Sequence, residues 1–246
     1  MIYLFDLLEF QVLAAAKGMN AYYGFPLEED HRPEDIRYAV YQMARDGILR
    51  QDDRGMVIQQ PYADLIGTIG EAETVTVMDR GQYQLPRRCV YAAGSQMTVM
   101  ESSTTDPAKL CLSGMTVEAL FQDLEDLCML PEARLTAELG EYDLEHYWQA
   151  HIRPELWNRL MREGEPESDA DSGEARLLDS ADIYAVYSLR DKTSGQLFER
   201  LILIDTPMEY GMVRQYGGKT PATVTIEPYN RSRMEEILKN WWRITI

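Results

Sequence analysis

One strand-like run of the sequence ends in an acidic residue of the kind that binds magnesium in nucleotide-hydrolysing enzymes. Residues 201–204 are followed by Asp205-Thr206-Pro207, and Gly217-Gly218-Lys219-Thr220 resembles part of a phosphate-binding loop. Such a loop needs a glycine five residues before its Gly-Lys pair, so that backbone amides can curl around the phosphates. Val213 occupies that position, and the residues after Lys219 read as a strand. Because one aspartate without a phosphate cradle cannot organise phosphoryl transfer, we expect no nucleotide to bind.

Histidine and cysteine, which carry much metal and nucleophilic chemistry, are few and unfavourably spaced. His31 falls in a predicted loop, and His146 and His151 would point about 140° apart on one helix, too far to share a zinc ion. No Gly-x-Ser-x-Gly motif occurs, no CxxC pair occurs, and no cysteine has a histidine near it in sequence. We therefore predict a protein that is not an enzyme and that needs neither a metal ion nor another cofactor.

Length and charge restrict the class of partner. A chain of 246 residues that is 45% hydrophobic can bury a sizeable core, and its net charge of −17 repels nucleic-acid phosphates and anionic membrane surfaces. It has no run of 18 apolar residues, and residues 1–10 lack the basic start of a signal peptide. An odd number of cysteines in apolar surroundings fits a reducing compartment. We expect a cytoplasmic protein that binds neither nucleic acid nor membranes.

The elements that would position a site occur in two similar series, far apart in the sequence. The first series has predicted strands at residues 74–78, 88–91, 96–100 and 110–112, then a helix at 117–127 capped by Thr116. The second has strands at 183–187, 200–204, 210–213 and 223–226, then a helix at 231–241 capped by Asn230. We predict an α+β fold in which pseudo-two-fold duplicated modules, each closed by a helix, form a central antiparallel or mixed sheet. No catalytic residue type is repeated between the modules, which favours a scaffold that presents a binding surface.

The first part of the chain has the pattern of a winged helix. Helices are predicted at residues 4–16 and 33–46, followed by a hairpin around Asp52-Asp53-Arg54-Gly55 and a third helix at 62–69. Winged helices commonly bind DNA, but residues 1–80 contain seven Lys or Arg against fourteen Asp or Glu. A structural or protein-contacting winged helix is therefore the main interpretation, and a winged-helix transcriptional regulator or a generic protein-interaction adaptor is the alternative.

The region between the two series reads as a helix at residues 139–161, interrupted or kinked at Pro154, and an acidic surface loop at 163–174. The resulting segments are 1–72, 73–130, 131–178 and 179–246, expected to form one integrated unit. Adjacent helical positions diverge by about 100°, so one ring of the Trp241-Trp242 pair should fill the core while the other covers a second surface. Tryptophan is frequent among residues that dominate interface energies, although these rings could equally cover helices of the same chain.

The order of features resembles the EspG-type chaperones of type VII (ESX) secretion, which hold a helical secretion substrate in the cytosol. The resemblance rests on the apolar first helix, the run Met43-Ala44-Arg45-Asp46-Gly47-Ile48-Leu49, and the closing series Asp205-Thr206-Pro207, Tyr210, Pro228 and a terminal helix containing Leu238. The family usually has a Gly-Arg-Tyr string after Asp-Thr-Pro, where this chain has Met208-Glu209-Tyr210.

The resemblance implies an α/β fold with approximate internal two-fold symmetry around a sheet. It also implies a partner, the exposed tip of a helical hairpin or hairpin pair in a secreted protein. In the family, a loop between early strands and a central helical region contribute to this contact. The matching loop here is residues 79–86, and the predicted partner-binding residues are Arg80, Gln82, Tyr83, Tyr147, Trp148 and Trp157.

Overall fold

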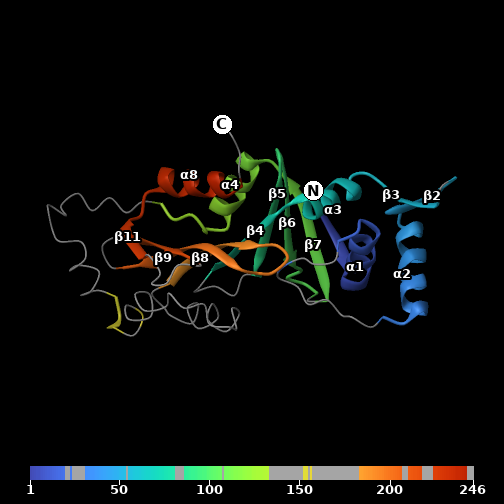
Figure 1. The fold of residues 1–246 in the computed structure, drawn as a ribbon, viewed down its shortest axis with the longest axis horizontal. Coiled ribbons are helices and arrows are strands. Elements are labelled where there is room, and N and C mark those ends of the chain that lie inside the picture. Colours follow the sequence, from blue (N-terminus) through green and yellow to red (C-terminus); the bar gives the residue numbers. More distant parts are fainter. Residues whose placement is uncertain are drawn as a thin grey trace.

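A broad antiparallel sheet forms the centre of the molecule. Within the described residues of this computed structural model, nine strands form that sheet, two form a separate hairpin, and five helices pack around them (Figure 1). The described residues are 1–19, 23, 31–53, 55–80, 86–106, 108–132, 152–154, 156, 183–206, 210–217 and 224–242. The fold is therefore α+β, as the sequence predicts.

The sheet consists of two four-stranded meanders and one added strand, in the order β1-β7-β6-β5-β4-β8-β9-β10-β11. Every neighbouring pair is antiparallel, and the two meanders meet where β4 pairs with β8, with Thr76 opposite Leu189. The eight predicted strands are confirmed, with longer bounds: β4 Thr74–Arg80, β5 Arg88–Ala93, β6 Gln96–Ser102, β7 Lys109–Met115, β8 Ile183–Asp191, β9 Leu197–Asp205, β10 Tyr210–Tyr216 and β11 Val224–Pro228. The ninth strand, β1 Ile2–Asp6, was not predicted.

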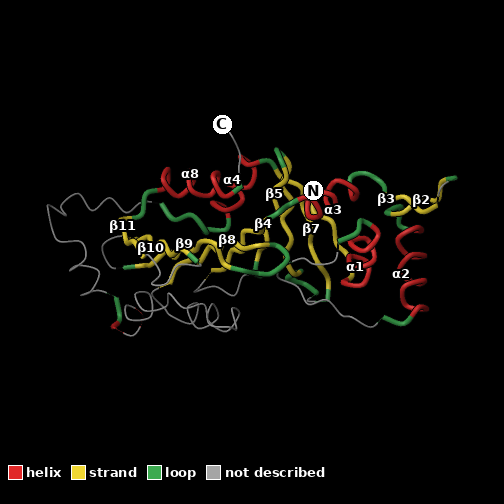
Figure 2. The backbone as a smooth tube through the Cα atoms, viewed as in Figure 1, coloured by secondary structure: helices red, strands yellow, loops and turns green. Residues whose placement is uncertain are grey.

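Helices α4 (Val117–Asp126) and α8 (Arg231–Trp241) lie on the same face of the sheet (Figure 2). Both are amphipathic, and their apolar sides join strand residues of both meanders in one buried cluster that includes Val90, Leu120, Leu124, Tyr187, Leu203, Met234 and Leu238. Trp241 and Trp242 are both buried in this cluster, which corrects the expectation that one ring covers a second surface. The sheet is broad enough for the diverging rings to cover different strands of it.

Each of these helices begins at the predicted capping residue. Thr116 Oγ1 accepts a hydrogen bond from the backbone N–H of Ala119 at 3.3 Å, and Asn230 Oδ1 accepts one from Arg233 N–H at 3.0 Å. The first N–H groups of a helix have no partner within the helix, so such side chains satisfy one of them. The caps explain why both helices start where the preceding strands end.

Replacing the cap Asn230 with alanine should lower the free energy of unfolding by about 1 kcal/mol, because one helix N–H then loses its partner. Denaturant unfolding followed by circular dichroism measures this loss. Asn240→Ala is the matched control, since Asn240 is exposed inside the same helix. It should leave stability unchanged or slightly raised. Equal losses in the two variants would contradict the capping role.

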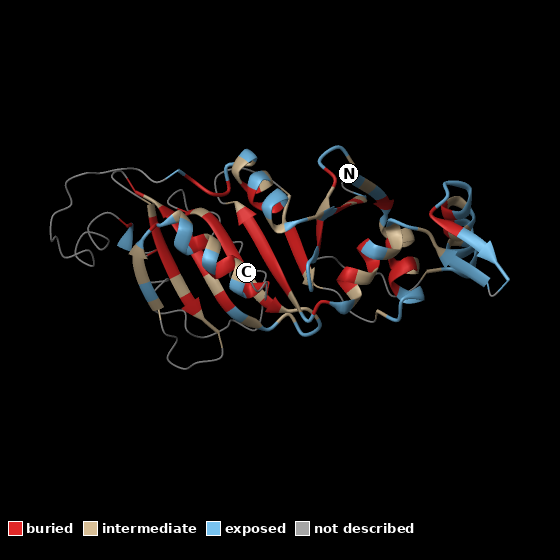
Figure 3. Ribbon diagram, turned by 90° about the horizontal axis from the view of Figure 1, so that it is seen from above, coloured by how far each residue is buried: buried red, intermediate tan, exposed pale blue. Residues whose placement is uncertain are grey.

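The opposite face of the sheet is covered in two parts. Helices α1 (Leu7–Ala16) and α3 (Tyr62–Glu71) pack on the first meander, in a buried cluster that includes Phe10, Leu13, Ile66, Ile69, Val75, Val77 and Met100. On the second meander, Ile152 and Leu156 pack against Ile183, Ile202 and Val213. The sheet is thus covered on both sides, and its central strands are largely buried (Figure 3). Apart from residues 152–154 and 156, the predicted helix at 139–161 lies outside the described residues, as does the predicted loop at 163–174.

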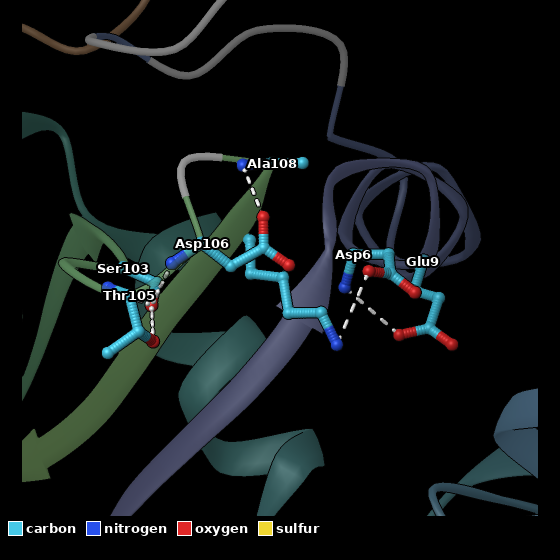
Figure 4. A network of polar contacts seen from close by, with 7 residues as sticks. Asp6, Glu9, Ser103, Thr105, Asp106 and Ala108 are labelled. Carbon is cyan, nitrogen blue, oxygen red and sulfur yellow. Dashed lines mark hydrogen bonds and ion pairs between the residues drawn. The ribbon is translucent and has the colours of Figure 1, made fainter.

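The predicted start of the first helix is wrong by three residues. Residues 2–6 form strand β1, which pairs with β7 so that Leu4 lies opposite Cys111, and α1 begins only at Leu7. The boundary is set by a capping box, in which the backbone N–H of Asp6 donates to Glu9 Oε2 at 3.1 Å (Figure 4). Lys109 Nζ from β7 lies 3.8 Å from Asp6 Oδ1 at the same corner.

Helix α2 (Pro33–Arg45) and the hairpin of β2 (Leu49–Asp52) and β3 (Gly55–Ile58) lie at one end of the molecule, far from α8 and β11 (Figure 1). Pro33 opens the helix, and Gly47 adopts φ +76° just after it, a conformation that favours glycine. The hairpin is confirmed, but it forms its own two-stranded sheet. On the inner side of α2, Met43 and Ala39 are buried, whereas Ala44 is exposed.

Candidate interaction surface

Arg80 is the one predicted partner-binding residue that falls in the described part of the chain. It is the last residue of β4, so the first two residues of the predicted contact loop 79–86 belong to that strand. The other five, Gln82, Tyr83, Tyr147, Trp148 and Trp157, lie outside the described residues. The geometry of the candidate site is therefore built from Arg80 and the side chains around it.

The guanidinium of Arg80 links the sheet to the end of α4. Its Nη1 donates a hydrogen bond to the backbone oxygen of Leu127 at 2.8 Å, and its Cζ lies 5.3 Å from the centre of the Tyr184 ring. The register of β4 and β8 explains the second contact, because Arg80 pairs with Ala185, the neighbour of Tyr184. A guanidinium over an aromatic face is a favourable electrostatic contact. Arg80 is thus fixed in place by the fold.

Two tyrosines of β8 also donate hydrogen bonds to the turn that follows α4. Tyr184 Oη donates to the backbone oxygen of Cys128 at 2.5 Å, and Tyr187 Oη donates to that of Met129 at 2.6 Å. The carbonyl groups at a helix C-terminus lack partners within the helix and carry partial negative charge, so donors and a cation suit this position. Burial raises the pKa of both tyrosines, well above the ordinary value for Tyr187, so both hydroxyls remain donors at neutral pH.

Further aromatic rings lie beside Arg80 and Tyr184, at the ends of neighbouring strands. The rings of Tyr184 and Tyr210 lie edge to face with centres 5.1 Å apart, and Tyr210 lies 6.3 Å from Tyr229. Because neighbouring strands are antiparallel, the end of β4, the starts of β8 and β10, and the residue after β11 all lie on the same side of the sheet, where these strands begin or end. We call Arg80, Tyr184, Tyr210 and Tyr229 the strand-end patch. Tyr184 and Tyr210 are half-buried, so part of each ring faces solvent.

The strand-end patch is suited to contact with another molecule. Tyrosine offers a large, rigid surface with one polar end, and tyrosine and arginine are both enriched in protein interfaces. The resemblance pointed to Arg80 but not to its neighbour Tyr184. A signal for it was available in the strand order. When two meanders join through the first strand of each, β4 and β8, the end of β4 lies beside the start of β8.

Most of the residues that suggested other chemistry fall outside the part of the chain that the structure describes. Gly218, Lys219 and Thr220, like His146 and His151, lie outside the described residues. Among the residues that are described, no group of three or more His, Cys, Asp or Glu side chains is arranged to hold a metal ion. In that same part of the chain, no helix combines the length and apolar character needed to span a membrane.

The strand-end patch therefore rests on geometry alone, since the sequence matches no protein-family model and no curated protein.

Proposed function

We propose that the protein is a non-enzymatic, cytoplasmic binding protein of the EspG type, which holds a helical secreted protein. The observation that supports this function is the strand-end patch. There, Arg80 lies at the start of the predicted contact loop 79–86, and Tyr184 and Tyr210 contribute partly exposed rings beside it. A helical hairpin tip presents apolar side chains and backbone polar groups, which tyrosine rings and a guanidinium can contact together.

We also infer that the two meanders and their helices are duplicated modules. Strands β4 to β7 followed by α4 correspond in this proposal to β8 to β11 followed by α8, related by an approximate two-fold axis between β4 and β8. Three features support it: the mirrored strand order, the antiparallel pairing at the centre, and two helices on one face. In the same proposal, α2 and its hairpin are a winged-helix-like segment used for structure or protein contact.

The charge of the chain suits such a binding role. An apolar client tip tends to aggregate, so a protein that covers it must add affinity without losing solubility. A few aromatic side chains can provide most of the binding energy. The net charge of −17 then keeps the complex soluble.

A photo-crosslinking aromatic amino acid in place of Tyr83 tests the location of the contact in the cells that make the protein. We expect it to form a covalent adduct with a small helical protein, identified by mass spectrometry. The same amino acid in place of Phe198 is the matched control, because Phe198 is 40% exposed on β9 and outside the predicted loop. Adducts from both positions, or an adduct with nucleic acid, would contradict the proposal.

Replacing Tyr83 with alanine should then weaken binding of that purified client about 30-fold, since truncating an aromatic anchor costs roughly 2 kcal/mol. Isothermal titration calorimetry measures this change. Phe198→Ala should bind as the unaltered protein does, and circular dichroism should show the same fold in both variants. Unchanged affinity in the Tyr83 variant would exclude the loop as the contact.

A further inference from the structure

The outer face of α2 carries four exposed side chains in one line. They follow one another at intervals of four, three and four residues: Glu34, Tyr38, Tyr41 and Arg45. Tyr38 is 66% exposed and Tyr41 64% exposed, which is unusual for large rings on a helix whose other face is already packed. Spacing of this kind places side chains along a single seam of a helix, as in the heptads of coiled coils. We call these residues the α2 seam.

A further observation shows that the charged ends of the α2 seam are available for contact. Within the described residues, Glu34 pairs with Arg32 at 3.7 Å and Arg45 pairs with Asp46 at 3.0 Å, and all four side chains are exposed. Exposed pairs contribute little energy, so either can be exchanged for a pair with another molecule.

The charge of this helix differs from that of the whole chain. Helix α2 contains two acidic and two basic residues and is therefore neutral, whereas the chain carries −17. Two copies of so acidic a protein repel each other over most of their surfaces. A neutral face with exposed aromatic rings is a place where that repulsion is small and apolar contact is available.

We propose that the α2 seam binds the α2 seam of a second copy of this chain, with the two helices antiparallel. A two-fold axis between Ala39 and Val40 then brings Tyr38 against Tyr41 of the second copy and Glu34 against Arg45 of the second copy. Each pair occurs twice, as a two-fold interface requires. One axis satisfies both pairs, because the order of side chains along the seam is acidic, aromatic, aromatic and basic. When a second helix runs in the opposite direction, each acidic residue faces a basic one and each aromatic ring faces another ring.

The size of the helix sets the strength of this dimer. Thirteen residues span about 20 Å, so the contact falls near or below the roughly 1,000 Å² typical of specific interfaces. The dimer should therefore be weak, dissociating as the protein is diluted to low micromolar concentration. This interface lies at the opposite end of the molecule from β11, so it goes beyond the client binding proposed above (Figure 1).

Charge reversal tests the pairing in the full chain by sedimentation velocity over a wide range of concentration. Glu34→Arg alone and Arg45→Glu alone each place like charges opposite one another twice, and each should weaken self-association roughly tenfold or more. The double variant restores both opposite-charge pairs and should recover the affinity of the unaltered chain. An equimolar mixture of the two single variants should also associate, because each supplies the charge that the other lacks.

The matched control is Arg233→Glu, which makes the same change of charge on an exposed position of α8. It should leave self-association unchanged. A monomeric unaltered chain at near-millimolar concentration would overturn the proposal, as would a double variant that associates no better than the single variants. A different protein bound to the α2 seam, with no self-association of the purified chain, would also overturn it.

Discussion

Replacing Trp241 with alanine is expected to lower the free energy of unfolding by about 4 kcal/mol, which denaturant titration would measure. Trp241 is the last residue of α8 and only 6% exposed, and its ring lies in the cluster shared by both meanders. Truncation leaves a large cavity there. It also removes the hydrogen bond from Trp241 Nε1 to Glu199 Oε2, which spans 2.9 Å between buried side chains.

Trp241→Phe separates the two contributions. Phenylalanine keeps most of the ring volume but has no N–H, so its loss should be about 1–2 kcal/mol, the cost of depriving a charged acceptor of one donor. Glu199 retains Arg214, whose Nε contacts the other carboxylate oxygen. A phenylalanine variant as unstable as the alanine variant would show that packing of the ring contributes little.

Arg88→Ala should cost about 3 kcal/mol of unfolding free energy, also measured by denaturant titration. Arg88 is 6% exposed on β5, its Nε donates to Glu101 Oε2 at 2.7 Å, and its Nη1 pairs with Asp123 of α4. Removing one partner of a buried ion pair commonly costs about 3–5 kcal/mol. The expected loss is at the lower end because Glu101 and Asp123 are 24% and 33% exposed and keep some hydration.

Arg233→Ala is the control for this prediction. Arg233 pairs with Glu236 at 2.7 Å, but both side chains are about half exposed, so its loss should change stability by less than about 0.5 kcal/mol. The loss of unfolding free energy in Arg88→Lys should fall between the losses in Arg88→Ala and Arg233→Ala. A lysine keeps the positive charge but cannot reach two carboxylates with the forked geometry of a guanidinium. Equal effects at positions 88 and 233 would contradict the stabilising role of burial.

The elements that are determined locally could be predicted well from the sequence. Strands rich in β-branched residues, and helices preceded by Thr116 or Asn230, carry their own boundary signals. The boundary at Asp6 was missed because apolar residues at helical spacing continue through β1. The capping-box pair Asp6 and Glu9 was the better signal, since it marks a helix start whatever precedes it.

Features that depend on distant parts of the chain were harder to predict. The resemblance pointed to Arg80, but its contacts with Leu127 and Tyr184 join three segments that only the folded sheet brings together. The two tryptophans show the same limit. Their rings do diverge, with Trp241 reaching Glu199 on β9 and Trp242 donating to Thr76 on β4. A sheet wide enough to bury both could not be inferred from helical geometry.

The pairing of β1 with β7 has a consequence for how the protein is made. Strand β1 is hydrogen-bonded in the finished sheet to β7, which is synthesised only after α1, α2, α3 and the five strands β2 to β6. Contacts between segments so distant in sequence form slowly, since a long intervening chain must first be ordered. The nascent protein is therefore expected to carry an apolar strand, Ile2–Asp6, without its partner until β7 has been synthesised.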